Sequence, residues 1–67
     1  MEFEEDRPIF RQIIDFCHRQ VLSGAWAPEE RVPSTKELAV TLTVNNRTVM
    51  KAYDELAAEG VIYQRRG

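Results

Sequence analysis

Two amphipathic helical patterns separated by a short break occupy residues 34–60, and this arrangement constrains the fold more than any other feature of the chain. The first pattern begins at Ser34, and Glu37 follows at the spacing of a capping box, in which two free backbone N–H groups are satisfied. Its apolar side chains recur at the spacing of one buried helix face. They are Leu38, Ala39 and Leu42.

The second pattern covers residues 47–59 and follows a break at Thr43-Val44-Asn45-Asn46. Its apolar side chains have the i, i+3, i+4, i+7 spacing of a helix with one buried face, and they are Val49, Ala52, Tyr53 and Leu56. Gly60 comes next, and glycine commonly ends helices because it adopts the left-handed conformation easily. Two helices joined by three or four residues predict a helix-turn-helix over residues 34–59.

A further helix of about four turns is predicted from Pro8 to Ser23-Gly24. Proline suits the first turn of a helix because its missing N–H needs no partner there, and Asp6 is placed to cap it. The expected buried face is Phe10, Ile13, Ile14, Cys17 and Val21, and the opposite face is Arg11, Gln12, Asp15, His18, Arg19 and Gln20. Trp26 is expected to cover this helix, with its indole N–H in water.

The two ends of the chain differ in character. Residues 1–7 are an acidic lead-in that we expect to be frayed, whereas residues 61–67 open with Val-Ile-Tyr and favour a strand. This strand would be the first half of a β-hairpin, with Arg65 and Arg66 at its tip. The predicted fold class is therefore mainly α with a small β-wing, a three-helix winged helix-turn-helix over residues 8–67.

Length and composition limit the 67-residue chain to one small domain. No apolar run approaches the roughly 20 residues needed to cross a bilayer. The acidic N-terminus is unlike a targeting segment and one cysteine forms no internal disulfide, so we expect a cytoplasmic protein without a membrane partner. The net charge of −2 is uneven, since residues 1–30 hold seven acids and three bases whereas residues 31–67 hold four acids and six bases. Such asymmetry favours a one-sided binding surface.

Catalytic and metal-binding chemistry has little support in the sequence. Cys17 and His18 are neighbours, so their side chains point about 100° apart on a helix and cannot act as a thiol–imidazole pair. One histidine and one cysteine cannot form a tetrahedral zinc site, and the chain has no glycine-rich phosphate loop. We therefore expect neither enzyme activity nor a cofactor.

Nucleic-acid recognition fits the second helix of the predicted motif, because such helices enter the major groove with their N-terminal residues facing base edges. The buried stripe leaves four positions facing outward, which are Arg47, Met50, Lys51 and Asp54. Arginine can pair with guanine and asparagine with adenine, and threonine or methionine methyl groups can contact thymine. Asn45 is better interpreted as the helix cap. The candidate DNA-binding residues are Ser34, Lys36, Asn46, Arg47, Thr48, Met50, Lys51, Arg65 and Arg66.

Some of these residues suit the DNA backbone rather than the bases. Ser34 and Lys36 open the first helix of the motif, where N–H groups and an ammonium group favour a phosphate. Arg65 and Arg66 suit adjacent phosphates or the minor groove. Each basic residue taken singly is more typical of a solvated surface charge. Taken together, these residues are expected on one side of a three-helix core, which favours DNA binding. The acidic first half also leaves open an alternative, a winged-helix module that binds proteins and has no DNA affinity.

Five motifs occur in order along the chain, and they are Pro8-Ile9-Phe10-Arg11-Gln12-Ile13, Gly24-Ala25-Trp26-Ala27-Pro28, Val32-Pro33-Ser34-Thr35-Lys36-Glu37-Leu38-Ala39, Val44-Asn45-Asn46-Arg47-Thr48-Val49-Met50-Lys51-Ala52-Tyr53 and Glu59-Gly60-Val61-Ile62-Tyr63-Gln64-Arg65-Arg66-Gly67. Together they resemble the N-terminal domain of GntR-family bacterial transcription regulators, and within that family the YtrA-like branch. The resemblance covers residues 8–67, and any one motif alone would be weak.

The resemblance implies a winged helix-turn-helix that binds double-stranded operator DNA as part of a homodimer, in a repressor more often than an activator. It implies contacts from the two helix starts and from a wing, at Ser34, Lys36, Asn46, Arg47, Thr48, Arg65, Arg66 and Gly67. It also implies a C-terminal domain beyond the wing, absent from this chain, that dimerises and often binds a small-molecule effector.

Several positions depart from the family pattern. Glu29 stands where the family usually has glycine, and Asn46-Arg47 differs from the Asn-Pro-Asn that is common in this branch. Lys36 stands where the family usually has arginine, so the paired hydrogen bonds of a guanidinium group are lost there while a phosphate contact is retained. Thr43 stands where the family usually has glycine, which costs stability if the position has a positive φ angle.

Overall fold

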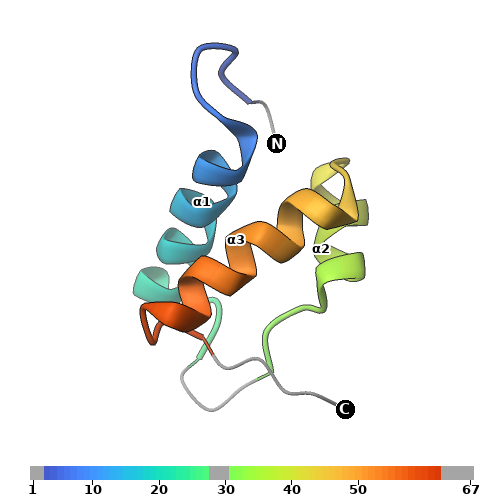
Figure 1. Ribbon diagram of the computed structural model, residues 1–67. Helices are drawn as coiled ribbons and strands as arrows, with labels where there is room; N and C mark the ends of the chain where they lie inside the picture. Colours follow the sequence, from blue (N-terminus) through green and yellow to red (C-terminus); the bar gives the residue numbers. More distant parts are fainter. Residues whose placement is uncertain (1–2, 28–30, 63–67) are drawn as a thin grey trace.

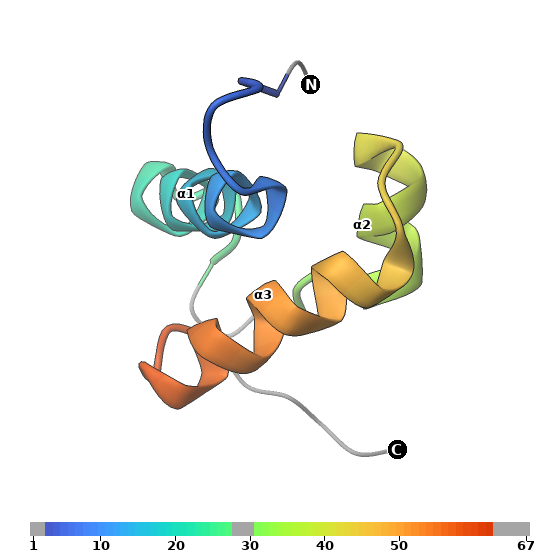
Figure 2. The ribbon, with the colours of Figure 1, turned by 45° about the horizontal axis from the view of Figure 1, so that its top comes forward.

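The computed structural model describes residues 3–27 and 31–62. These residues form three helices, α1 (Ile9–Ser23), α2 (Thr35–Leu42) and α3 (Asn46–Ala58). Both α1 and α2 pack against α3, which crosses in front of them in Figure 1. Figure 2 shows α1 and α2 on the same side of α3. The predicted three-helix, mainly α class is therefore confirmed.

The start of α1 differs from the prediction. Pro8 is the N-cap residue, and no side chain caps the helix. The carbonyl oxygen of Pro8 accepts hydrogen bonds from the backbone N–H groups of Arg11 (3.2 Å) and Gln12 (3.4 Å). The expectation that Asp6 caps this helix is therefore wrong, because Pro8, with its extended backbone, already occupies the capping position. The C-terminal end is as predicted, with Gly24 in the left-handed region at φ 83°.

Gln12 was expected on the solvent face of α1, but it is buried with 5% of its surface exposed. Its amide nitrogen donates to the carbonyl oxygens of Glu4 (2.8 Å) and Arg7 (3.0 Å), and its amide oxygen accepts from the backbone N–H of Glu4 (2.7 Å). Arg7 also pairs with Glu4 at 3.2 Å and with Asp15. Residues 3–7 are thus held on α1 rather than frayed as predicted.

The caps of the helix-turn-helix agree with the sequence analysis. The Ser34 hydroxyl accepts from the backbone N–H of Glu37 (3.1 Å), and the Glu37 carboxylate accepts from the backbone N–H of Ser34 (2.9 Å). The Asn45 side-chain oxygen accepts from the backbone N–H of Arg47 at 2.8 Å and caps α3. These contacts fix where α2 and α3 begin.

The C-terminal end of α3 forms a Schellman motif around Gly60 at φ 78°. The backbone N–H of Gly60 donates to the carbonyl of Ala57 (3.0 Å), and that of Val61 donates to the carbonyl of Leu56 (2.9 Å). Ile62 then returns to the core with 7% of its surface exposed. The chain direction after α3 is set by these bonds.

The core is built mainly from the three predicted apolar faces, although Val21, expected on the buried face of α1, is only partly buried. The buried members of the core are Ile13, Ile14, Cys17, Leu38, Ala39, Leu42, Val49, Ala52, Tyr53, Leu56 and Ile62. The Tyr53 hydroxyl donates to the Pro33 carbonyl at 2.7 Å, and burial raises the pKa of this phenol. Trp26 packs edge-on against Phe16 of α1, with ring centroids 6.3 Å apart and planes at 83°, so the predicted cover over this helix is confirmed.

The predicted wing falls largely outside the described residues. Val61 and Ile62 are described, and neither is in a strand. Residues 63–67, including Arg65, Arg66 and Gly67, lie outside the described part of the chain. No helix within residues 3–27 and 31–62 combines the length and apolar character needed to span a bilayer.

Candidate nucleic-acid interface

The outward face of α3 carries the side chains that the sequence analysis placed there. Met50 is 48% exposed whereas the adjacent Val49 is fully buried. Arg47, Lys51 and Asp54 are also exposed. Since Val49, Ala52, Tyr53 and Leu56 all turn into the core, the helix cannot be rotated by half a turn. The first two turns of α3 therefore present a guanidinium group, a thioether and an ammonium group to the outside.

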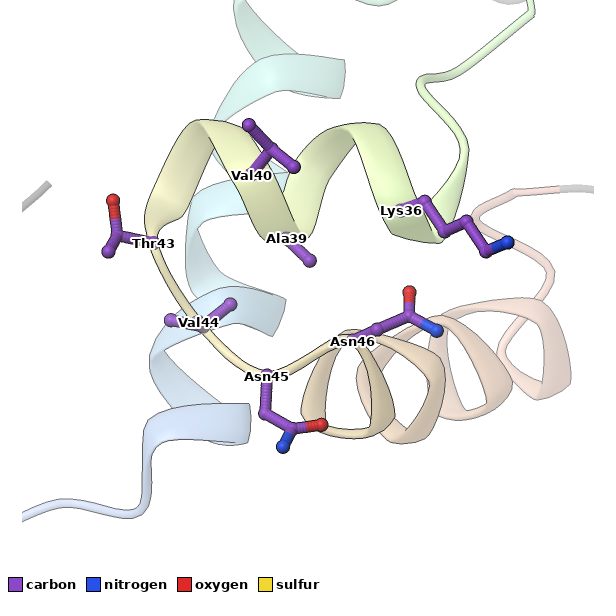
Figure 3. A pocket seen from close by; sticks show the side chains of 7 residues that line it. All are labelled: Lys36, Ala39, Val40, Thr43, Val44, Asn45 and Asn46. Carbon is purple, nitrogen blue, oxygen red and sulfur yellow. The ribbon is translucent and has the colours of Figure 1, made fainter.

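A shallow hollow separates α2 from the start of α3 (Figure 3), lined by Lys36, Ala39, Val40, Thr43, Val44, Asn45 and Asn46. Its apolar part comes from α2 and from the turn. The Lys36 side chain extends from the first turn of α2, and the Asn46 amide projects from the first turn of α3 toward α2. Folding thus brings Lys36 and Asn46, ten positions apart in the chain, to one hollow.

The Asn46 amide is positioned by its own helix. Its nitrogen lies 3.6 Å from the Met50 sulfur, one turn further along α3. Its oxygen is buried and has no hydrogen-bond partner among the described residues. A thioether is a weak acceptor, so the amide N–H groups retain the capacity to bond a better acceptor.

Two further candidates lie at the starts of the helices. Ser34 is half-buried, and its hydroxyl oxygen accepts from the backbone N–H of Glu37 in the capping box. Thr48 is half-buried on α3. The Asn45 side chain is used as the cap, in agreement with its exclusion from the candidate list. The structure thus places the candidates at residues 34–51 along the α2 and α3 starts, whereas Arg65, Arg66 and Gly67 are outside the described residues.

Lys51 has a neighbour that sequence reasoning missed. Its ammonium nitrogen lies 4.0 Å from the centroid of the Phe10 ring, and the guanidinium carbon of Arg11 lies 5.4 Å from the same centroid. The sequence analysis assigned Phe10 to the buried face of its helix and Arg11 to the opposite face, yet the Phe10 ring is only partly buried. Helical periodicity carries no signal for a contact between α1 and α3, so spacing alone could not reveal it.

The capping box also creates a testable pH dependence. The backbone N–H and then the hydroxyl of Ser34 bond the Glu37 carboxylate and hold its pKa below the usual 4.5. A carboxyl group with a lowered pKa stabilises the folded state above its unfolded pKa, and this contribution is lost as the pH falls through the folded pKa. The melting temperature of the wild type should therefore exceed that of Glu37→Gln at neutral pH, and the difference should shrink below pH 4.5.

Glutamine keeps a side-chain acceptor and removes only the charge, so this comparison isolates the carboxylate. Circular dichroism melting curves of both proteins across the acidic range measure it. A difference in melting temperature that stays constant from neutral to acidic pH would contradict the prediction.

Comparison with known proteins places this arrangement in a family. Residues 10–67 match the family described as bacterial regulatory proteins, gntR family. The chain belongs to the GntR family. This match covers most of the chain and confirms the resemblance drawn from the five motifs.

Individual GntR relatives include the HTH-type transcriptional repressor YtrA of Bacillus subtilis (strain 168), which is 43% identical over 60 residues, 90% of this chain and 46% of YtrA. The uncharacterized regulator YhcF of the same organism is 30% identical over 66 residues, 98% of this chain and 54% of YhcF. The histidine utilization repressor of Pseudomonas aeruginosa is 33% identical over 64 residues, 96% of this chain and 26% of that protein. The chain thus spans about half the length of these relatives or less.

Proposed function

We propose that this domain binds double-stranded DNA in a sequence-specific manner, as the DNA-binding part of a GntR-type transcriptional regulator. The observation that carries the proposal is the orientation of α3. Its buried stripe obliges Arg47 and Lys51 to face outward, on a helix of the width that the major groove admits. Asn45 is the N-cap residue of α3. The first turn of α3 is therefore the part proposed to meet the base edges.

Separate roles follow from the chemistry of each group. Arg47 is proposed to read guanine through paired hydrogen bonds to O6 and N7, and Asn46 to contact a base edge through its amide, with Thr48 and Met50 supplying methyl contacts. Lys36 and Ser34, at the start of α2, are proposed to bind phosphate. Arg65, Arg66 and Gly67 are proposed to reach the adjacent backbone or the minor groove.

The relatives support a repressor within a longer protein. YtrA and the histidine utilization repressor are named as repressors, and this chain covers only part of each. We propose that the whole protein is a cytoplasmic homodimer that binds two operator half-sites. We also propose that its remaining part holds the dimer contacts and a small-molecule effector site. The domain itself is proposed to have no catalytic activity.

A selection from a duplex library with a randomised centre tests the proposal. The wild-type chain should enrich a defined motif, and its affinity should fall steeply as salt increases because counterions leave the phosphates on binding. Arg47→Ala should lose preference among bases at the contacted position, whereas Lys36→Ala should weaken binding to all sequences about equally and reduce the salt dependence.

Arg19→Ala serves as the control, because Arg19 is exposed on α1 and belongs to neither helix start. It should leave both affinity and sequence preference unchanged. If Arg47→Ala keeps the wild-type sequence preference, the assignment of α3 as the recognition helix is wrong. A folded wild-type chain without DNA affinity at low salt would instead favour the protein-binding module that the acidic first half suggests.

A further inference from the structure

The Phe10 ring joins α1 to the outward face of α3. It lies in the first turn of α1, and the Lys51 ammonium group of α3 lies 4.0 Å from its centroid. Arg11 places a second positive charge 5.4 Å from the same centroid. Two cations from different helices are thus gathered around one aromatic side chain, at the edge where α1 meets α3.

The contact restricts a side chain that would otherwise be mobile. An exposed lysine has many rotamers, and ordering it costs conformational entropy. Attraction between the ammonium group and the negative face of the ring opposes that cost and favours one position. Lys51 remains exposed, so its ammonium hydrogens that do not face the ring can still bond an anion. The ring therefore orients the charge and leaves it accessible.

The position of Lys51 relative to Arg47 identifies which part of DNA it would meet. The two residues are four apart on α3, so Lys51 lies about 6 Å further along the helix axis on nearly the same face. Recognition helices contact base edges mainly through their N-terminal residues, and phosphate contacts fix their register. Lys51 lies one turn beyond Arg47, and its ammonium group is directed toward Phe10 of α1. This position suits a contact with the phosphate backbone at the edge of the major groove.

We propose that Phe10 is a positioning residue that holds the Lys51 ammonium group for contact with a backbone phosphate, on the side of α3 that faces the first turn of α1. The inference rests on the proposed function, since it assumes that α3 is the recognition helix. The positive charge of Arg11 beside the ring adds to the attraction for the same strand. Phe10 itself touches no base.

The test compares Phe10→Leu, Phe10→Tyr, Lys51→Met and the double variant Phe10→Leu/Lys51→Met by binding to the selected duplex at several salt concentrations. Lys51→Met should lower the slope of log affinity against log salt by about 0.9, because one phosphate contact is lost. The advantage of the wild type over Lys51→Met should therefore shrink about threefold between about 50 and about 200 mM salt. Sequence preference should stay unchanged.

Phe10→Leu should also weaken DNA binding and lower the slope of log affinity against log salt. Phe10→Tyr keeps an aromatic face and should retain the wild-type affinity and slope. The double variant should bind no more weakly than Lys51→Met alone, since the ring acts only through the lysine. In the free protein, the proton resonances of the Lys51 ε-methylene should carry a ring-current shift that Phe10→Leu removes. Arg19→Gln, an exposed charge on α1 away from the ring, should change none of these quantities.

Failure of this inference is distinct from failure of the proposed function. If the wild type shows no salt-dependent DNA binding, the proposed function fails and the inference falls with it. If the wild type binds and Lys36→Ala weakens it, but Lys51→Met keeps the wild-type slope, only the inference is overturned. It is also overturned if Phe10→Leu and Lys51→Met weaken binding independently. Lys51 is exposed, so Lys51→Met should fold. Its salt dependence can therefore be measured even if Phe10→Leu does not fold.

Discussion

Replacing Leu56 with alanine is expected to destabilise the domain by about 3 kcal/mol, because the change removes buried methyl groups and leaves a cavity. Leu56 is fully buried within the core that the three helices share. A domain of this size has a total stability of only about 3–10 kcal/mol. The loss therefore removes about a third or more of the folding free energy, and Leu56→Ala should unfold at a much lower urea concentration than the wild type.

Leu22→Ala provides a matched control, since it is the same chemical change at a side chain that is 86% exposed on α1. It should shift the unfolding midpoint in urea only slightly, whereas Leu56→Ala should shift it strongly. Circular dichroism of the helices during urea unfolding measures both. Similar midpoints for the two variants would contradict the core described above.

Thr43→Gly is expected to stabilise the domain by about 1 kcal/mol. Thr43 has φ 57° and ψ 52° at the C-terminal end of α2, a left-handed conformation that costs an L-residue roughly 1–2 kcal/mol. A β-branched side chain is especially disfavoured there. Glycine removes the strain, although part of the gain is lost because glycine has more conformational entropy when unfolded. The urea midpoint should rise.

Replacing a glycine that has a positive φ angle with a residue that carries a side chain provides the control. Gly24 also lies in the left-handed region, at φ 83°, and a Cβ atom added there would meet nothing within 4 Å. Gly24→Ala should therefore destabilise the domain through backbone strain alone. Thr43→Asn should fall between threonine and glycine, because asparagine tolerates this conformation better than most residues. A Thr43→Gly variant that is less stable than the wild type would contradict the assignment of strain.

The helices and their ends were largely predictable because their causes are local. Capping boxes, N-caps and left-handed glycines act within four or five residues, so Ser34, Asn45 and Gly60 could be read directly from the chain. Helical periodicity then separated the buried stripe of α3 from its outward face. The same two arguments placed the candidate interface at the starts of α2 and α3.

The errors arose where distant segments meet. Gln12 was assigned to solvent because periodicity describes one helix and not the segment that folds over it, and residues 3–7 cover this amide. Asp6 had the chemistry of a cap, but Pro8 took the position. Phe10 was assigned only to the buried face because nothing in the spacing of α1 indicates a lysine on α3.

The sequence by itself determined three helices, the caps of α2 and α3 and the outward direction of Arg47, since each depends on residues within about two helical turns. Only the tertiary structure decided that Lys36 and Asn46 share a hollow, that Gln12 holds the N-terminal segment and that Lys51 lies over Phe10. The reason is physical: local hydrogen bonding and periodicity set which way a side chain leaves its helix, whereas packing between helices sets what that side chain meets.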